Sequence, residues 1–449
     1  MAENVDVVVI GMGPGGEDAA GRLAAAGLSV VGIDARLLGG ECPYYGCVPS
    51  KMMIRAADAL AEARRVPQFA GTDTVEADWT KVADRVRDEA TDNWDDAVAV
   101  KRFTDKGGRF VRGRARLSGP HTVSVNGEDF TAGRAIVLNT GTEPNVPPIT
   151  GLTDTPYWTN REAITTREVP ASLCVLGGGA IGLELALVFA RFGSKVTVVE
   201  AGERLLALEE PEAGKLLAEV FTDEGLTVRT GSSATSVSHD GNEFTVDLSD
   251  GQVRADALLV ATGRRTNLAD IGLETVGLDP KARFLDPDEW MRVADGVWAI
   301  GDITGKGAFT HVSMYQADVA VRDILGQGGP AAEYHALPRV TFTDPEVGAV
   351  GITEEQAREQ GLNVRVGLTD LAYSTRGFIH RAKGLIKVVE DADAGVLVGG
   401  TAAGPSGGEV LSALAVAVHG RVPTDRLASM IYAYPTFHRA IQSAIADLH

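Results

Sequence analysis

The sequence predicts an α/β protein with two βαβ units and a separate α+β domain. Near residue 10 the chain shows a fixed order of segments: an apolar run, a glycine-rich turn, a helix-like stretch and a second apolar run that ends in an acid. The same order is found again near residue 175. Beyond residue 338, β-like runs are followed by helix-like segments. Repeated strand–turn–helix–strand units predict parallel sheets, whereas strands followed by helices indicate a domain of another type.

The first unit begins with the apolar run 6–10 and continues into a turn containing Gly11, Gly13 and Gly16. A helix-like stretch and a second apolar run follow, and this run ends at Asp34. Such glycines let backbone N–H groups approach a pyrophosphate at a helix N-terminus, and the acid accepts hydrogen bonds from a ribose diol. A G-x-G-x-x-G match is credible in this context.

The second unit repeats the pattern from residue 173, with Gly177, Gly179 and Gly182 in the turn and Glu200 at the end of the second run. In both copies the acid stands 18 residues after the third glycine. One such motif is a weak signal, but two with the same spacing strongly indicate two Rossmann-like units that bind two dinucleotides.

Other segments complete the predicted organisation. Helices are expected at residues 50–65 and 79–101, and apolar runs end at Gly141 and Gly263. Linkers are expected near residues 144–148 and 326–338. The β-like runs beyond them are 339–347, 384–390 and 395–400, with helices from residue 409.

Cys42 and Cys47 are the chemically most informative residues. The chain has three cysteines in 449 residues, and these two are five positions apart directly after the first nucleotide unit. Residues 48–51 predict a helix start, which places Cys47 near a positive helix end and one turn from Lys51; both effects favour a thiolate. A zinc site would need further ligands at metal-binding spacing, and none is apparent. Cys174 is predicted to be a small buried filler.

Composition narrows the class of protein further. A chain of this length is expected to form two or three domains. Its net charge of −19 argues against binding to nucleic acid or an anionic membrane surface. Nothing resembles a secretory signal or a membrane span, and three cysteines do not make a secreted disulfide scaffold. A cytoplasmic enzyme is expected.

The chain resembles the class I pyridine nucleotide-disulfide oxidoreductases, the family of dihydrolipoamide dehydrogenase, glutathione reductase and mercuric reductase. The resemblance covers essentially the whole length. It is carried, in order, by the segments 11–16, 39–51, 177–184, 261–264, 299–302, 342–348 and 434–436.

This resemblance implies an FAD-binding domain formed by residues 1–149 and 268–336, an NAD(P)-binding domain over 150–267 and a dimerisation domain over 337–449. Asp302 would bind the flavin ribityl chain, and Gly141 and Gly263 would belong to the cofactor sites. Cys42 would be the exposed thiol that meets substrate, and Cys47 the thiol stacked on the flavin. A hydride would pass from nicotinamide to FAD, and the electrons would open the Cys42–Cys47 disulfide. A homodimer is implied.

Two further residues gain roles through the resemblance. Lys51 would lie near the flavin N5 and pair with Glu184 of the nicotinamide unit. His311, in the segment 309–313, is interpreted as a structural hydrogen-bonding residue close to the flavin rather than a proton carrier.

Glu200 favours NADH over NADPH. A carboxylate at this position accepts from the free 2′-hydroxyl of NADH and repels a 2′-phosphate. Glu203 adds a second negative charge, whereas Arg204 is a counter-argument.

The chain departs from the family at the end of the dimerisation domain. Disulfide-reducing members have a His-Pro-Thr-x-x-Glu motif whose histidine, from the partner subunit, moves a proton. Here Tyr434 replaces the histidine and Arg439 the glutamate. A phenol with an ordinary pKa near 10 is a poor base at neutral pH. His438 is interpreted as a surface or interface residue, and Tyr434 as an active-site candidate.

The predicted function is therefore reduction of a small disulfide or thiol-reactive substrate other than lipoamide by an FAD- and NAD(P)H-dependent enzyme. Direct electron transfer from the flavin to a quinone is an alternative, because the proton carrier is missing. Mercuric ion reduction is another, although no cysteine follows Cys174 to capture Hg²⁺ near the C-terminus. A redox-sensing flavoprotein is the alternative outside catalysis.

Overall fold

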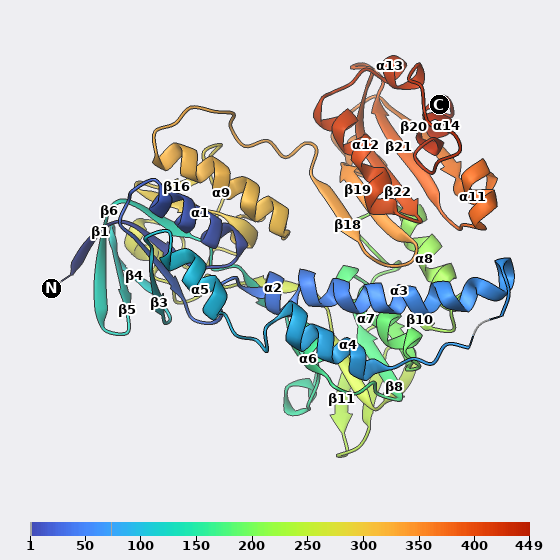
Figure 1. Ribbon diagram of the computed structural model, residues 1–449, viewed down its shortest axis with the longest axis horizontal. Helices are drawn as coiled ribbons and strands as arrows, with labels where there is room; N and C mark the ends of the chain where they lie inside the picture. Colours follow the sequence, from blue (N-terminus) through green and yellow to red (C-terminus); the bar gives the residue numbers. More distant parts are fainter. Residues whose placement is uncertain (1, 73) are drawn as a thin grey trace. The chain divides into compact units, whose positions relative to one another are not determined.

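The computed structural model describes residues 2–72 and 74–449, which form two compact units (Figure 1). The first unit comprises the chain up to residue 52 together with 83–145 and 263–333. The second comprises 53–82, 146–262 and 334–449. This architecture confirms the predicted α/β fold with a separate α+β segment. The three predicted domain boundaries stay a prediction.

A mostly parallel sheet forms the centre of the first unit. Its strand order is β16-β17-β6-β1-β2-β3, and the hairpin strands β4 and β5 extend it beside β6. The strands are β1 (Glu3–Ile10), β2 (Val30–Asp34), β3 (Arg109–Arg112), β4 (Arg116–Gly119), β5 (Thr122–Val125), β6 (Glu128–Leu138), β16 (Arg292–Ala294) and β17 (Val297–Ala299). Strands β7 (Thr142–Pro144) and β15 (Arg264–Thr266) form a separate antiparallel pair.

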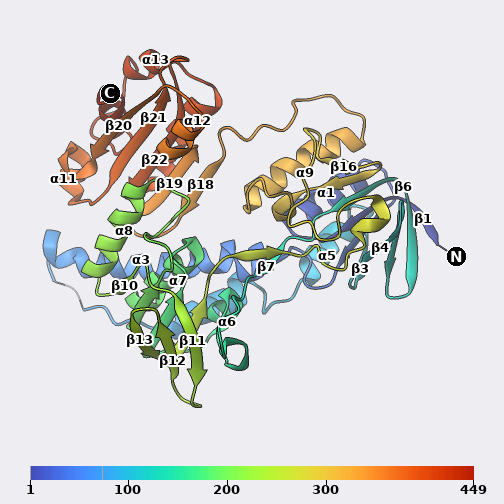
Figure 2. The ribbon, with the colours of Figure 1, turned by 180° about the vertical axis from the view of Figure 1, so that it is seen from behind.

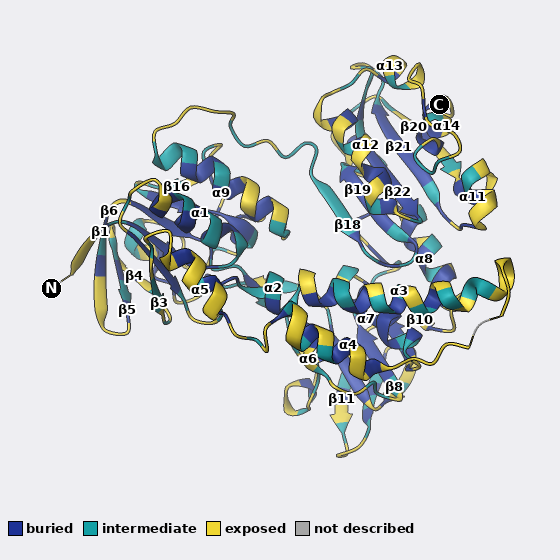
Figure 3. Ribbon diagram, viewed as in Figure 1, coloured by how far each residue is buried: buried dark blue, intermediate teal, exposed yellow. Residues whose placement is uncertain are grey.

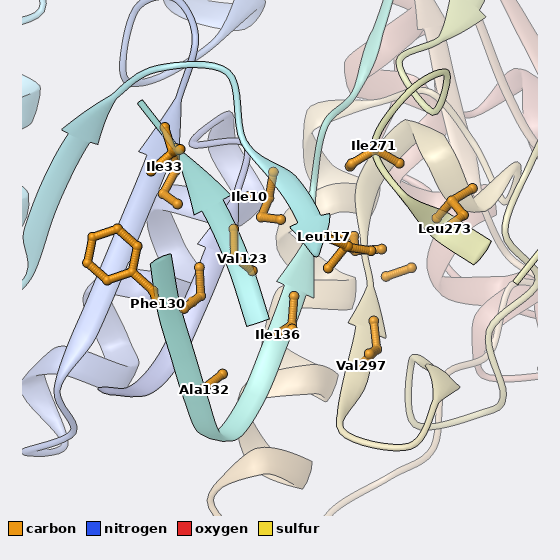
Figure 4. Packing of buried hydrophobic residues seen from close by; sticks show 14 of the residues in the cluster. Ile10, Ile33, Leu117, Val123, Phe130, Ala132, Ile136, Ile271, Leu273 and Val297 are labelled. Atoms are coloured by element: carbon orange, nitrogen blue, oxygen red, sulfur yellow. The ribbon is translucent and has the colours of Figure 1, made fainter. Parts of the chain in front are cut away.

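The helices of this unit include α1 (Pro14–Ala25), which packs against α9 (Thr310–Ile324). The remaining helical segments are α2 (Glu41–Tyr45), the start of α3 (Cys47–Phe69), the end of α4 (Trp79–Arg85), the π-helix η1 (Val86–Ala90), α5 (Ala97–Thr104), η3 (Leu273–Val276) and η4 (Gly301–Thr304). Residues Ile10, Ile33, Leu117, Phe130 and Ile136 belong to the buried cluster between the central sheet and the hairpin (Figure 4).

The second unit contains the repeated nucleotide motif on a four-stranded parallel sheet of order β10-β9-β8-β14. Its strands are β8 (Ser172–Leu176), β9 (Lys195–Val199), β10 (Thr227–Arg229) and β14 (Ala257–Val260), and its helical segments are η2 (Leu152–Asp154), α6 (Asn160–Thr165), α7 (Ala180–Arg191) and α8 (Pro211–Asp223). An antiparallel sheet of β11 (Ala234–His239), β12 (Phe244–Leu248) and β13 (Gly251–Ala255) adjoins it (Figure 2).

The C-terminal part of this unit is a five-stranded antiparallel sheet of order β18-β19-β22-β21-β20. Its strands are β18 (Pro338–Thr341), β19 (Glu346–Gly351), β20 (Val364–Asp370), β21 (Leu385–Asp391) and β22 (Val396–Gly404). Its helices are α10 (Glu354–Glu359), η5 (Leu371–Tyr373), α11 (Thr375–His380), α12 (Gly407–His419), α13 (Thr424–Ala428) and α14 (Ala440–Ala446). The central strands are buried, whereas α11 is mostly exposed (Figure 3).

Two sequence predictions were wrong in detail. The helix expected over 79–101 is interrupted, because α4 passes into a π-helical turn and three residues with positive φ follow: Asp92, Asn93 and Trp94. The run 339–347 is not one strand but the adjacent ends of β18 and β19, separated by a tight turn at Asp344-Pro345. Neither break is signalled by glycine, and a proline marks only the second.

Across the described ranges, 2–72 and 74–449, no helix is long and apolar enough to span a bilayer.

Candidate active site

The two cysteines lie at a break between two helices of the first unit. Cys42 is in the short helix α2, and Cys47 is the first residue of α3, as the sequence predicts. Gly40, with φ +70°, brings this segment against the first glycine turn, because a Cβ on Gly40 would stand 2.8 Å from Gly13 Cα. The backbone N–H of Gly39 donates to the Met12 carbonyl at 2.7 Å. The dithiol is thus joined directly to the nucleotide turn.

Cys47 has the features of a stabilised thiolate. The neighbouring Cys42 thiol, the Thr310 hydroxyl and the charge of Lys51 together lower the pKa of Cys47 below its ordinary value, although partial desolvation of the sulfur opposes them. The start of a 23-residue helix adds a favourable dipole. At neutral pH, therefore, Cys47 is the ionised sulfur of the pair.

Cys42 is the protonated member of the pair. Its hydrogen bond to Cys47 and its burial raise the pKa of Cys42 well above its ordinary range. Cys42 is half-buried in α2, and Cys47 is exposed at the start of α3. The roles that the resemblance implies, with Cys42 meeting the substrate and Cys47 stacked on the flavin, stay a prediction. No disulfide joins Cys42 and Cys47 in this structure, and the effect of each sulfur on the pKa of the other places the two sulfurs near each other.

Thr310, the first residue of α9, was not recognised from the sequence. Its Oγ1 lies 3.4 Å from Cys47 Sγ. Helix α9 is also attached to the nucleotide turn, because Ser313 Oγ donates to Asn139 Oδ1 at 3.3 Å and Asn139 Nδ2 donates to the Gly11 carbonyl at 3.2 Å. The glycine turn, α9 and the dithiol therefore form one connected structure.

Trp94 supports the segment between the cysteines. Its indole N–H donates to the Tyr44 carbonyl at 3.1 Å, and its ring stacks on Tyr45 with centroids 6.4 Å apart. Three consecutive non-glycine residues with φ between 47° and 56° direct this side chain. Left-handed backbone costs roughly 1–2 kcal/mol per residue, so the packing of Trp94 must offset this strain.

The first glycine turn fits a bound dinucleotide. A Cβ on Gly11 would stand 2.2 Å from the Asn139 carbonyl oxygen, and one on Gly16 would stand 2.0 Å from the Gly11 carbonyl oxygen. These two glycines are therefore required by packing. A Cβ on Gly13 would meet only Asn139 Nδ2, at 3.4 Å, so packing explains this glycine far less and close approach by a ligand explains it better. The buried Thr140 hydroxyl, which has no partner among the described residues, also fits a polar ligand.

The acids of the first unit are placed around this turn. The Asp34 carboxylate accepts from the backbone N–H of Met12 at 2.7 Å and of Arg36 at 2.8 Å. Burial raises the pKa of Asp34 despite these bonds. Asp302 accepts from the Thr142 hydroxyl at 2.5 Å, and Arg264 Nε donates to the same hydroxyl oxygen at 2.7 Å. Thr142 and Arg264 thus position the predicted ribityl-binding carboxylate.

The second glycine turn has the same construction. A Cβ on Gly177 would stand 2.4 Å from the Ala261 carbonyl oxygen, and one on Gly182 would stand 2.3 Å from the Gly177 carbonyl oxygen. A Cβ on Gly179 would meet nothing within 4 Å. The middle glycine is again not required by packing, which fits close approach of a pyrophosphate.

The Glu200 carboxylate binds backbone N–H groups at the second glycine turn, as the Asp34 carboxylate does at the first. Glu200 accepts from the backbone N–H groups of Gly178 and Gly202, both at 2.6 Å. Arg204 donates to the carbonyls of Leu206 at 2.9 Å and Ala207 at 2.8 Å. The arginine that argued for a 2′-phosphate is therefore bound to backbone.

The remaining predicted residues belong to several places. Lys51 is half-buried in the first turn of α3, and Glu184 is buried on α7, where it accepts from the Phe342 N–H at 2.8 Å. The pairing of Lys51 with Glu184 stays a prediction. Gly141 and Gly263 have φ values of +65° and +115°, and a Cβ would meet nothing within 4 Å at either. Both therefore fit the predicted cofactor contacts.

His311, Cys174 and His438 differ in how far they are exposed to solvent. His311 is exposed on α9 and stacks on Phe309, with centroids 5.2 Å apart. Cys174 is 0% exposed, and burial raises its pKa to about 12, so it is the inert filler that the sequence predicted. His438 is half-buried beside Tyr432, with centroids 6.0 Å apart.

Tyr434 lies on the surface of the C-terminal sheet domain and is 66% exposed. Its hydroxyl donates to Thr375 Oγ1 at 3.1 Å, and the Arg439 guanidinium lies 5.4 Å from its ring centroid. The two residues that replace the family's proton-carrying pair thus contact each other.

Two dinucleotide turns and a thiol pair joined to the first of them define a flavoprotein disulfide oxidoreductase. Comparison with known proteins places the chain in this class. The family Pyridine nucleotide-disulphide oxidoreductase matches residues 5–322, and its dimerisation domain matches 337–445. The chain belongs to this family, whose members use FAD and a pyridine nucleotide and act on sulfur groups.

Relatives and solved structures cover nearly the whole chain. Dihydrolipoyl dehydrogenase of Thermus scotoductus is 34% identical over 99% of the chain and 97% of its own length. Mercuric reductase of Shewanella putrefaciens is 32% identical over 96% and 78%, respectively. The crystal structure of LpdA from Mycobacterium tuberculosis is 27% identical, with a TM-score of 0.86 and coverage of 98% of this chain and 99% of that one.

A further solved structure is the Cu(II) complex of the HOCl-induced flavoprotein disulfide reductase RclA from Escherichia coli. It is 26% identical, with a TM-score of 0.86 and coverage of 99% of both chains. The match to the dimerisation domain supports a homodimer.

Proposed function

We propose that this enzyme uses NADH to reduce a disulfide or another thiol-reactive substrate through Cys42. The proposal is carried by the environment of the two neighbouring sulfurs: the Thr310 hydroxyl lies 3.4 Å from Cys47 Sγ and Lys51 lowers the pKa of Cys47, whereas the pKa of Cys42 is raised. When bound, FAD supplies two electrons from the nicotinamide to a neighbouring disulfide. The chain's own residues then have to hold the proton, orient the sulfurs and admit the substrate.

The dithiol can reduce a substrate disulfide without an outside base. Cys42 attacks one substrate sulfur while its proton moves to Cys47, and the first substrate thiolate leaves. Cys47 then gives up this proton to that thiolate, directly or through water, and attacks Cys42 Sγ. The second substrate thiolate leaves and the Cys42–Cys47 disulfide forms. Overall, R–S–S–R with one thiol and one thiolate gives R–SH, R–S⁻ and the protein disulfide.

This route addresses the loss of the family's histidine. In this route Cys47 accepts the Cys42 proton only as the new sulfur–sulfur bond forms, so the pair itself supplies the base that the missing histidine would have been. In the proposed homodimer, Tyr434 would come from the partner subunit and donate a hydrogen bond to the substrate. A phenolic O–H group donates hydrogen bonds readily but is a poorer general base than an imidazole.

NADH is the proposed reductant because of Glu200 and Arg204. Two backbone N–H groups fix the Glu200 carboxylate at the end of the second strand, where it would repel a 2′-phosphate. Arg204, which could offset that charge, donates to two backbone carbonyls instead.

The test is an acceptor panel of small disulfides, quinones and Hg²⁺, run with NADH and with NADPH. Turnover of a disulfide should fall at least a hundredfold in Cys42→Ser and in Cys47→Ser. Alkylation and mass measurement after anaerobic NADH treatment should find two more thiols than in the oxidised enzyme. Quinone turnover that survives in Cys42→Ser, with no disulfide reduced, would overturn the proposal in favour of direct transfer from the flavin.

A thiophilic metal ion is the second candidate substrate, since a thiol–thiolate pair is a soft ligand set. Within the part of the chain that the structure describes, no group of three or more His, Cys, Asp or Glu residues could hold a metal ion. Such an ion would thus be held by the two cysteines during turnover. NADH oxidation that responds to Hg²⁺ or Cu²⁺ but to no disulfide would identify it.

A further inference from the structure

Two segments of the C-terminal sheet domain have no acidic residue, in a chain that contains 61 of them. They are residues 371–384, which include α11, and residues 426–446, which include Tyr434. Both carry cationic or titratable basic side chains: Arg376, His380, Arg381, Lys383, Arg426, His438 and Arg439. Lys383 is paired with Asp223 outside these segments, but the remaining cations give a local excess of positive charge on a protein of net charge −19, which favours an anion.

Three contacts join these segments into one cluster. Tyr434 donates to Thr375, the Arg376 guanidinium lies 5.7 Å from the Phe437 ring centroid, and the His380 ring meets Phe437 edge-on with centroids 5.3 Å apart. Arg439 lies over the Tyr434 ring at 5.4 Å. We call Thr375, Arg376, Tyr434, Phe437 and Arg439 the arginine–aromatic cluster.

The two guanidinium groups of the cluster are held by ring faces instead of carboxylates. Among residues 2–72 and 74–449, neither Arg376 nor Arg439 forms an ion pair with an Asp or Glu. The acids nearest in sequence are engaged elsewhere, since Asp370 accepts from the Ala372 N–H and Asp447 from the Leu368 N–H. A ring face orients a guanidinium but leaves its N–H donors to bind a second partner.

The exposure of the cluster allows such a partner to reach it. Arg439 and Thr375 are exposed, Arg376 and Phe437 are half-buried, and the Tyr434 side chain is mostly exposed. Planar guanidinium groups form paired hydrogen bonds with carboxylates and sulfonates, and neighbouring aromatic rings offer apolar contact for the rest of such a molecule.

We propose that the arginine–aromatic cluster binds an anionic group, a carboxylate or sulfonate, on the substrate that is reduced at Cys42. This inference rests on the proposed function both for the role of Cys42 and for Tyr434 of the partner subunit in the proposed homodimer meeting the same substrate, and on the cluster's own contacts for the anion. Arg376 and Arg439 are specificity-determining residues, and the substrate class is a small organic disulfide or thiol adduct that bears negative charge.

Two aromatic disulfides of different charge test the proposal. The FAD-loaded enzyme is assayed with the dianion 5,5′-dithiobis(2-nitrobenzoate) and with neutral 4,4′-dithiodipyridine. In Arg439→Gln and in Arg376→Gln, the ratio of kcat/KM for the dianion to kcat/KM for the neutral disulfide should fall about tenfold, and Arg439→Lys should recover part of it. Arg426→Gln, an exposed arginine of the same domain outside the cluster, should leave the ratio within twofold of wild type.

Direct binding separates this proposal from the proposed function. The FAD-loaded enzyme is titrated calorimetrically with terephthalate, a dianion that cannot be reduced, and with the neutral terephthalamide. This binding measurement does not depend on Cys42. If terephthalate binds more tightly than terephthalamide and this preference is lost in Arg439→Gln, the anion site is supported. That conclusion holds even if Cys42→Ser keeps its turnover, in which case only the proposed function fails. Equal binding of the two compounds, or an equal loss in Arg426→Gln, overturns the site whatever the kinetics of Cys42→Ser.

Discussion

Thr310 Oγ1 lies 3.4 Å from Cys47 Sγ, although the two residues are 263 positions apart in the sequence. The contact brings the first residue of α9 to the first residue of α3, two helices attached to the same nucleotide turn. The hydroxyl is thus one of the groups that favour a thiolate at Cys47.

Thr310→Val should weaken this thiolate. Loss of one hydrogen bond to a charged sulfur corresponds to about one pH unit, so the pKa of Cys47 should rise by about that amount. The rate of Cys47 alkylation by iodoacetamide, measured against pH in the Cys42→Ser background, reports the change. Thr310→Ser keeps the hydroxyl and should keep the profile of its parent; identical profiles for Val and Ser would contradict the role.

Trp94→Phe should lower the free energy of unfolding by about 1 kcal/mol. The variant keeps an aromatic ring beside Tyr45 but loses the hydrogen bond to the Tyr44 carbonyl. Urea unfolding measures the change. Trp290→Phe is the matched control, because the Trp290 indole N–H has no hydrogen-bond partner in the described part of the chain. Equal effects of the two substitutions would show that the Trp94 bond contributes nothing.

Arg191→Met should be far more destabilising. Arg191 is 3% exposed and pairs with Asp58, Glu224 and Asp344, so the variant leaves these acids around an uncharged side chain. Removing one partner of a buried ionic network costs about 3–5 kcal/mol. Arg85→Met, which breaks an exposed pair with Glu89, should cost less than about 1 kcal/mol in the same urea experiment. Similar losses in the two variants would contradict the network's importance.

Asp58 should make stability fall as pH rises. Burial raises the pKa of Asp58 to about 6, so between its ordinary value near 4 and pH 6 the folded chain binds more protons than the unfolded chain. Stability linked to Asp58 is therefore complete below pH 4 and is lost through this window.

Asp58→Asn should remove that decline. Relative to wild type, the variant should gain about 1 kcal/mol between pH 4 and pH 7, a figure reduced for solvent screening because the Asp58 side chain is 41% exposed. Urea unfolding at the two pH values measures it. A constant difference between wild type and variant would mean that Asp58 titrates alike in both states.

Sequence reasoning identified the parts of the site that are local in the chain. Each glycine turn, its acid and the helix start at Cys47 lie within about 40 residues, and the pattern of each segment suffices to place them. Thr310 could not be assigned in this way, because its contact depends on how α9 packs against α1. The sequence analysis gave a functional interpretation to the neighbouring His311, because its side chain is titratable. In the structure, however, it is the Thr310 hydroxyl that contacts the Cys47 sulfur.

Trp94 and the contact of Arg376 with Phe437 were missed for different reasons. Trp94 follows a π-helical turn and lies in the segment 91–96, whose Thr, Asp and Asn residues have low helix propensity, but neither glycine nor proline marks the break. Arg376 and Phe437 are 61 positions apart. The packing of a guanidinium against an aromatic ring has no characteristic residue spacing, so a sequence motif could not predict this contact. The lack of acids in 371–384 and 426–446 was the available signal.

Glu200→Gln should reduce the preference for NADH. The amide keeps an acceptor for one of the two backbone N–H groups of Gly178 and Gly202 but loses the charge that repels a 2′-phosphate. The ratio of kcat/KM for NADH to that for NADPH should fall about tenfold, equivalent to about 1.4 kcal/mol. Glu203→Gln, which removes an exposed charge from the same loop, should change the ratio less than twofold. If Glu203→Gln lowers the ratio as much as Glu200→Gln, the preference comes from the overall charge of the loop rather than from the carboxylate fixed at the glycine turn.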